Sequence, residues 1–321
     1  MSESAPSLIS QNSQSLREVF GVELAKLAAK NSQLVALDGD VAGGTGLHHF
    51  RSEFPERFIQ VGIAEQNLVG VSAGLARSGF VPFAGTFAAF FLRAVDQIRV
   101  SVCYPKSNVK LVASHPGLDV GPDGASAQSL EDLAVFRSLP NLLVVAPGTP
   151  SEMAAATRAI AAFDGPAYMR TGRSPVPELS IPAWDFRLGE ANQVAEGNDV
   201  AIFACGPGIY WAISAANILR EEGISARVVS HPTIKPLDEE AILRAAVETK
   251  GIVVAEDHSV VGGLGSAVAE FLSENRPTSV LRIGVRDSFG ESGENLELWR
   301  KYGMTAATVA AACRDLVRNH G

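Results

Sequence analysis

A single carboxylate stands at the junction between a hydrophobic segment and a polar, helix-forming one. The stretch Gly62–Asn67 reads GIAEQN, with Glu65 near its centre. Desolvation by apolar neighbours raises the pKa of such a carboxyl group, whereas the N-terminus of a helix lowers it. These neighbours are Val61, Ile63, Leu68 and Val69. A carboxylate held between the two effects can share a proton with a heterocyclic ligand, although a helix-capping acid would give the same local pattern.

Aromatic side chains recur along a second candidate segment, which reads GTFAAFFLRAVDQIR over residues 85–99. Phe87, Phe90 and Arg93 follow one another at intervals of three residues, so on a helix they fall near one face. The two rings could stack on a flat ligand ring with Arg93 alongside. An aromatic stripe at this spacing also suits a protein core, and the local pattern leaves both interpretations open.

A third candidate is a long polar loop that follows a hydrophobic run. Residues 114–126 read SHPGLDVGPDGAS. Open α/β sheets bind ligands beyond the carboxyl ends of their parallel strands, and loops there carry functional side chains. His115 and Asp123 are therefore candidate ligand-binding residues, with a surface turn as the alternative.

Other patterns argue against further sites. The glycine-rich stretches DGDVAGGTG (38–46) and VGGLG (261–265) spell neither a dinucleotide fingerprint nor a Walker loop, so they predict turns. Cys103, Cys205 and Cys313 are far apart, which indicates neither a disulfide framework nor a zinc site. They predict buried thiols in a reducing compartment.

Hydrophobic runs suited to buried strands alternate with helical patterns along the chain, which is typical of α/β architecture. Predicted strands lie at 33–38, 58–63, 109–114, 142–146, 166–170, 200–204, 226–230, 252–255 and 280–283. Predicted helices lie at 16–29, 65–76, 86–102, 130–139, 150–163, 210–220, 238–249, 264–274 and 296–302. We therefore predict an α/β fold of two domains, each a mainly parallel sheet flanked by helices.

The chain has 321 residues, enough for two hydrophobic cores. Residues 174–186 contain three prolines, which interrupt helices and favour an extended connection. We expect a flexible start (1–14), a first domain (15–173), a linker (174–192) and a second domain (193–321).

The net charge is −8, which argues against a nucleic-acid partner, since such binding requires a basic surface. No secretory signal or membrane-spanning run is evident. We expect a cytoplasmic protein.

Taken together and in this order, these segments resemble the pyrimidine-binding domain of transketolases. The likeness includes LDGD, GIAEQN, TFAAFFLRAVDQIR, the SHPG…GPDGAS loop, LEDLAVFRSLPN and MRTGR. Further along, HPTIKPLD resembles the C-terminal domain of the same family. The resemblance extends from about residue 16 onward and implies an enzyme that uses thiamine diphosphate to transfer a two-carbon ketol unit from a ketose phosphate to an aldose.

The resemblance assigns cofactor roles to specific residues. Glu65 matches the glutamate that bonds the aminopyrimidine ring and activates the cofactor. Phe87 and Phe90 match the aromatic residues that pack on that ring, and Arg93 stands where relatives have tyrosine or arginine. Asp40 matches an active-site carboxylate of the family, with a structural role as the alternative.

Substrate roles follow from the same resemblance. Arg17, His115 and Arg173 match positions that hold the sugar phosphate, and Asp123 matches a carboxylate that contacts substrate hydroxyls. Two positions depart from the family, because Gly44 replaces a phosphate-binding serine and Ala127 replaces a histidine or glutamine. These departures leave the identity of the sugar open.

The resemblance also implies a missing half-site. Asp40 and Asn67 partly match the metal motif of thiamine enzymes, but Val41 occupies its second glycine position, so we expect no metal site in this chain. A partner subunit, corresponding to the N-terminal part of a transketolase, should hold the cofactor's diphosphate and Mg²⁺. We expect an α2β2-like assembly.

Three alternatives remain open. The β subunit of a 2-oxoacid dehydrogenase shares the fold, the glutamate and the need for a partner, and its loop can read much like GPDGASA. A deoxyxylulose-phosphate synthase-like enzyme is the second. The third is a non-catalytic scaffold subunit, against which a carboxylate in an apolar pocket argues.

Overall fold

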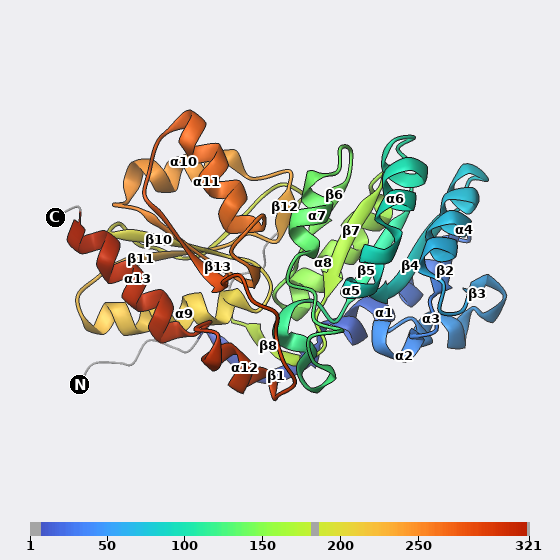
Figure 1. Cartoon of the computed structure of the whole chain (residues 1–321), viewed down its shortest axis with the longest axis horizontal. Helices are drawn as coiled ribbons and strands as arrows, with labels where there is room; N and C mark the ends of the chain where they lie inside the picture. The colour runs from blue at the N-terminus through green and yellow to red at the C-terminus, as the bar shows by residue number, and fades with distance from the viewer. Residues whose placement is uncertain (1–7, 181–185, 320–321) are drawn as a thin grey trace.

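The computed structural model describes residues 8–180 and 186–319. Two main sheets lie side by side along the long axis of the molecule, each with helices on its faces (Figure 1). The predicted α/β fold with two mainly parallel sheets is confirmed. Within the described part of the chain, no helix combines the length and hydropathy that a bilayer crossing needs.

The first sheet has seven strands in the order β12-β6-β7-β5-β4-β2-β3. All its pairings are parallel except that of β12 with β6. The strands are β2 (Leu34–Asp38), β3 (Phe58–Gln60), β4 (Val81–Phe87), β5 (Lys110–Ser114), β6 (Leu143–Val145), β7 (Ala167–Thr171) and β12 (Thr233–Lys235). Every residue of β2, β5 and β7 is buried, as expected for strands covered on both faces.

Helices and short helical turns surround this sheet. They are α1 (Leu16–Ala28), α2 (Ala42–Thr45), α3 (His48–Glu53), η1 (Pro55–Arg57), α4 (Glu65–Arg77), α5 (Ala88–Phe91), η2 (Leu92–Ala94), α6 (Val95–Gln97), η3 (Ile98–Cys103), η4 (Gly117–Asp123), α7 (Asp132–Ser138) and α8 (Pro150–Ala162). The single helix predicted for residues 86–102 is wrong. Thr86 and Phe87 extend β4, which pairs with β2 and β5, and the remainder divides into α5, η2, α6 and η3.

The second sheet has five strands in the order β14-β13-β10-β11-β9, of which only β9 is antiparallel to its neighbour. The strands are β9 (Asn192–Ala195), β10 (Val200–Ala204), β11 (Ala226–Ser230), β13 (Ile252–Ser259) and β14 (Val280–Val285). The helices are α9 (Gly208–Glu221), α10 (Glu239–Glu248), α11 (Leu264–Asn275), α12 (Asn295–Lys301) and α13 (Ala306–Asn319). The sequence patterns missed α13.

A two-stranded sheet lies at the lower middle of Figure 1, where β1 (Ile9–Ser15) pairs antiparallel with β8 (Pro175–Leu179). Residues 9–14, which we predicted as part of a flexible start, instead form most of β1. The predicted linker over 174–192 likewise begins with a paired strand, and its residues 181–185 lie outside the described residues. Every residue of β1 after Ile9 is polar, so the strand has no hydrophobic pattern, and its pairing with β8 identifies it.

Contacts between the two halves are extensive and partly polar. The Arg170 guanidinium binds the Asp132 carboxylate within the first domain and donates to the backbone oxygen of Asp257 in the second. Strand β12 leaves the second domain and completes the edge of the first sheet beside β6.

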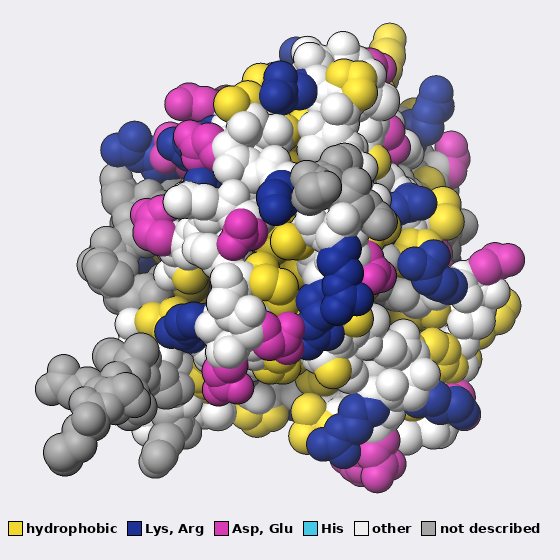
Figure 2. Space-filling model, turned by 90° about the vertical axis from the view of Figure 1, so that its left-hand side faces the viewer, with side chains coloured by type: hydrophobic (Ala, Val, Ile, Leu, Met, Phe, Trp, Pro, Cys, Tyr) yellow, Lys and Arg dark blue, Asp and Glu magenta, His cyan; other side chains and the backbone are white. Residues whose placement is uncertain are grey.

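The end of the second domain carries basic, acidic and apolar side chains interspersed on one face (Figure 2).

Candidate active site

The residues singled out from the sequence gather along one edge of the first sheet. Parallel strands end on the same side of a sheet, where open α/β folds bind their ligands. Arg173 follows β7, His115 follows β5, Phe87 ends β4, Asp40 follows β2 and Glu65 follows β3. Because the strands stand in the order β7-β5-β4-β2-β3, the phosphate candidates lie toward one end of this edge and the cofactor candidates toward the other.

Glu65 is the first residue of α4 and is 5% exposed. Its Oε2 lies 3.6 Å from Nε of Arg93, whose side chain is 73% exposed. Leu68 and Val69 are fully buried beside it along the helix, but Ile63 is 78% exposed. The expectation that Ile63 desolvates Glu65 is therefore wrong for this chain, because the loop before α4 turns that side chain outward.

The aromatic residues form a stack. Phe87 lies parallel to Phe90, with ring centroids 5.1 Å apart, and its other neighbour is the His115 ring at 3.9 Å. Both phenylalanines are half-buried, so they keep aromatic surface for a ligand ring. Arg93 faces Glu65, which places a cation beside the carboxylate at this end of the sheet edge.

The position of the Phe87 ring explains why residue 44 is glycine and not the serine that the resemblance leads one to expect. A Cβ atom added at Gly44 would lie 2.7 Å from Cε1 of Phe87 and 3.4 Å from Cε1 of His115. The first distance is shorter than any ordinary carbon–carbon contact, so a serine here would displace the Phe87 ring. Glycine at position 44 therefore suits the observed position of Phe87.

Arg17 and His115 meet although they are 98 residues apart, with Nη1 of Arg17 at 3.4 Å from Nε2 of His115. Arg17 also donates to the Gly44 backbone oxygen at 3.4 Å. The Ser114 hydroxyl lies 2.6 Å from Nδ1 of His115 and 2.8 Å from the same Gly44 oxygen. Burial, followed by the charges of Arg17 and Arg173, lowers the pKa of His115 to about 3. The imidazole is thus neutral near pH 7 and can donate or accept a hydrogen bond.

Arg173 and Asp123, the other two residues predicted to contact substrate, come from the loop after β7 and from η4. Nη1 of Arg173 lies 3.0 Å from Oδ1 of Asp123 and also donates to the backbone oxygen of Val120. Asp119, at the start of η4, accepts from the backbone N–H of Arg173 at 2.6 Å. Arg173 and Asp123 are therefore fixed to each other, and the charge of each acts on the pKa of His115.

Asp40 stands apart from this cluster. It is exposed and has a positive φ of 68°, and its Oδ1 accepts from the Gln60 side chain at 3.4 Å. Gln60 also donates to Asp38 at 2.7 Å. Ala127, the second departure, is 7% exposed and brings no polar group toward His115.

A carboxylate of the second domain supports this site and was missed by the sequence patterns. Asp257 accepts from the backbone N–H groups of Leu118 and Asp119 at 2.9 and 3.1 Å, and from Nε1 of Trp299 at 3.1 Å. It therefore holds the start of η4, the element that ends at Asp123. Asp257 lies in the polar second half of β13, which reads EDHS over residues 256–259 and extends beyond the strand predicted at 252–255; no motif singled it out.

Comparison with known families identifies this arrangement. Residues 12–178 match the transketolase pyrimidine-binding domain, and residues 189–309 match the transketolase C-terminal domain. The chain belongs to the transketolase family. Among the enzyme classes weighed from the sequence, the prediction of a transketolase subunit, and hence of a transferase, is confirmed.

Relatives of this transketolase chain include subunits of divided enzymes. The 6-deoxy-6-sulfo-D-fructose transketolase subunit SqwH of Clostridium sp. (strain MSTE9) is 42% identical over 302 residues, covering 94% of each chain. One subunit of the apulose-4-phosphate transketolase of Phocaeicola vulgatus is 38% identical over 304 residues, covering 94% of this chain and 97% of the relative. A split-gene transketolase, solved as an inactive β4 tetramer, superposes with a TM-score of 0.89 and 46% identity over 96% of this chain and 99% of that one.

Transketolases depend on thiamine diphosphate, and the residues of this transketolase chain fit the aminopyrimidine part of that cofactor. A buried carboxylate needs a hydrogen-bond partner, and the ion-pair partner of Glu65 is a largely exposed arginine that can move aside. The half-buried Phe87–Phe90 pair offers flat apolar surface at the same edge of the sheet.

Proposed function

We propose that this transketolase subunit contributes the aminopyrimidine half of an active site that is completed by a second polypeptide. The observation that carries the proposal is the contact between the two groups of residues at the carboxyl ends of the strands: the Phe87 ring of the Phe87–Phe90 stack lies 3.9 Å from the ring of His115, which meets Arg17, and buried Glu65 follows β3 on the same side of the sheet. Cofactor-binding and anion-binding groups thus adjoin, as transfer from a phosphorylated sugar requires.

Glu65 is the proposed catalytic residue. Its carboxylate would hold a proton at the aminopyrimidine ring, and its burial strengthens that hydrogen bond relative to water. Phe87 and Phe90 would pack on the ring, with Arg93 and Asp40 at its margins. When bound, thiamine diphosphate supplies a carbon nucleophile that accepts the two-carbon unit.

Arg17, His115 and Arg173 are the proposed sugar-phosphate ligands, with Asp123 binding the hydroxyl groups. Two guanidinium groups beside a neutral imidazole form a local anion site in a chain whose net charge is −8, and charge-assisted arginine contacts are short-ranged enough to act there. Gly44 and Ala127 remove two polar side chains from this site, so the accepted ketose should differ from those of serine-bearing relatives.

The partner we propose is an N-terminal transketolase subunit that binds the diphosphate and Mg²⁺. The split-gene transketolase of similar fold is inactive as a β4 tetramer, which supports self-association without activity until the partner is added. We propose an α2β2 assembly in the cytoplasm, where the three buried free cysteines stay reduced. We also propose that residues 15–173 and 193–321 are its two domains.

Reconstitution tests both parts of the proposal. The purified chain with thiamine diphosphate and Mg²⁺ should give no ketol transfer, and addition of the N-terminal subunit should restore it. Full activity of the chain by itself would refute the divided site.

In the reconstituted enzyme, Glu65→Gln should lower turnover by at least ~100-fold, the lower end for a general acid–base group, with assembly by size-exclusion chromatography retained. The exposed Glu53 provides the matched control, Glu53→Gln, which should keep wild-type turnover. Equal activity of the two variants would show that Glu65 is not catalytic.

A further inference from the structure

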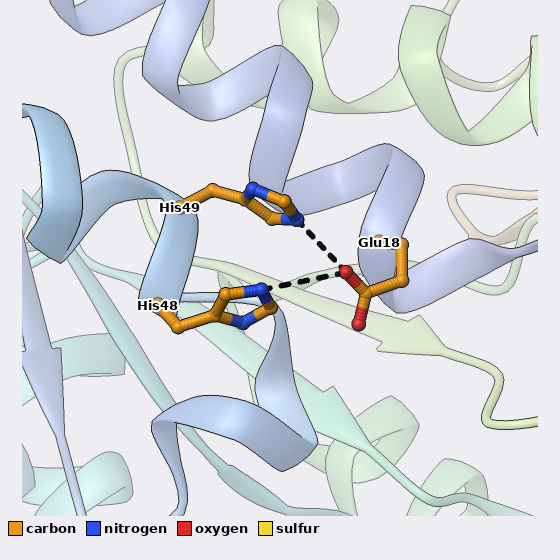
Figure 3. Close-up of side chains that lie close together, drawn as sticks. All are labelled: Glu18, His48 and His49. Carbon is orange, nitrogen blue, oxygen red and sulfur yellow. Dashed lines mark hydrogen bonds and ion pairs between the residues drawn. The ribbon is translucent and has the colours of Figure 1, made fainter.

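A cluster of one carboxylate and two imidazoles lies outside the proposed active-site groups. Glu18 belongs to α1, whereas His48 and His49 are the first two residues of α3. Both imidazole rings face the same carboxylate (Figure 3). Oε2 of Glu18 lies 2.8 Å from Nε2 of His49 and 3.6 Å from Nε2 of His48. We propose that Glu18, His48 and His49 form a binding site for a transition-metal cation of the zinc class.

The geometry suits three ligands around one cation. A zinc-class ion lies about 2.0–2.2 Å from its ligand atoms, so neighbouring ligands in a tetrahedral site are ~3.4 Å apart. The ligand atoms here all lie within 4.8 Å of one another, and rotation of the partly exposed side chains suffices to bring them to that spacing. Three protein ligands leave the fourth position for water, and a surface hollow of about 430 Å³ borders Glu18 and His49.

The backbone is arranged to bring these ligands together. A Cβ atom at Gly21 of α1 would lie 2.1 Å from the backbone oxygen of Gly46 and 2.9 Å from Cδ2 of His49. One at Gly46 would lie 2.0 Å from the backbone oxygen of Arg17. Glycine at both positions thus permits the close approach of α1 to the start of α3 that places Glu18 over the two histidines. The contacts of Gly21 with Gly46 and of Gly46 with Arg17 join backbone atoms, so they do not depend on the side chains of Glu18, His48 and His49.

The ligand types select the metal. Two imidazole nitrogens with one carboxylate suit Zn²⁺, Co²⁺, Ni²⁺ or Cu²⁺, whereas Mg²⁺ and Ca²⁺ prefer oxygen ligands. Two features reduce the affinity. Arg17 Nε lies 3.7 Å from Oε1 of Glu18 and competes for its charge, and Nδ1 of His48 is buried without a hydrogen-bond partner. Histidine ligands are usually supported through that second nitrogen, so we expect a site that loads reversibly.

Titration of the untagged chain with ZnCl₂ and CoCl₂ tests the proposal at about pH 7.5, where free imidazole is neutral. Calorimetry should give one equivalent of bound Zn²⁺, and Co²⁺ should produce the visible absorption of a low-symmetry, near-tetrahedral complex. MgCl₂ should not displace either ion. Since loss of even a supporting group costs about 10–100-fold in metal affinity, Glu18→Gln, His48→Asn and His49→Asn should each weaken Zn²⁺ binding by at least ~10-fold.

Glu53→Gln is the matched control, because it removes the same charge from an exposed residue of α3 itself, and it should bind Zn²⁺ as the wild type does. Melting curves in EDTA establish that each variant is folded. Should a histidine variant fail to fold, Glu18→Gln still decides the matter, since its side chain is 40% exposed. Wild-type affinity in Glu18→Gln, an equal loss in Glu53→Gln, or absence of binding to the wild type would each overturn the proposal.

Discussion

Two neighbouring glycines of α2 give a sharp test of how the aromatic stack is positioned. A Cβ atom at Gly43 would meet no heavy atom within 4 Å, whereas one at Gly44 would lie 2.7 Å from the Phe87 ring. Gly43→Ala and Gly44→Ala are therefore the same chemical change in the same helix with different surroundings. Any difference between them reports the contact with Phe87.

The expected magnitudes follow from two opposing effects. Replacing a helical glycine by alanine stabilises a protein by roughly 0.5–1 kcal/mol, because the unfolded chain loses conformational freedom. Overpacking costs about 1–3 kcal/mol, and Phe87 cannot easily give way since it is stacked on His115 at 3.9 Å and on Phe90 at 5.1 Å. We expect Gly43→Ala to be stabilising or neutral and Gly44→Ala to be less stable than it by about 1–3 kcal/mol.

Urea unfolding of the isolated chain measures this difference in stability. In a Phe87→Leu background, Gly44→Ala should cost less stability than it does in the wild type, because the ring that the new methyl group would contact is absent. In the reconstituted enzyme, Gly44→Ala should also raise KM for the ketose phosphate, while Gly43→Ala serves as the reference. Equal stability of the two alanine variants would show that Phe87 moves aside freely. The explanation of Gly44 as a consequence of the stack would then fail.

Two further predictions concern pH and the contact between domains. The pKa of His115 is about 3 in the folded chain and about 6.5 when unfolded, so between about pH 6.5 and pH 3 only the unfolded state takes up this proton as the pH falls. The free energy of unfolding should therefore decrease toward acid by up to ~1.4 kcal/mol per pH unit from this group. His115→Asn should flatten the dependence measured by urea unfolding, and an unchanged slope would contradict the assignment. Asp257→Asn should turn an amide N–H₂ toward N–H groups from which the Asp257 carboxylate now accepts hydrogen bonds. The variant should lose about 1–3 kcal/mol of folding stability, and it should raise KM for the ketose phosphate because η4 is held less firmly. The exposed Asp315 gives the control Asp315→Asn, and equal stability and KM in the two variants would exclude the positioning role of Asp257.

Much of the fold could be predicted because its strands are buried on both faces. Runs such as LVAL in β2 and VAIFA in β10 are continuous hydrophobic segments, and every residue of these two strands is buried in the structure. Strand β4 escaped prediction because Pro82 and Gly85 lie within it, two residues that normally disfavour strands. Pairing with β2 and β5 on either side overrides that local preference. Helix propensity failed for Thr86 and Phe87 for the same reason.

The chain's own sequence determined the chemical types at the site, since a carboxylate, two phenylalanines and a histidine follow hydrophobic strands at Glu65, Phe87, Phe90 and His115. The tertiary structure decided which of them meet. Strand order, which no local pattern encodes, sets β5 between β7 and β4 and so brings His115 to Phe87. Packing of α1 against α2 and α3 brings Arg17 to His115 and Glu18 to the two adjacent histidines. Contacts of this kind join residues far apart in the chain, and they form only when the burial of several elements is satisfied at once.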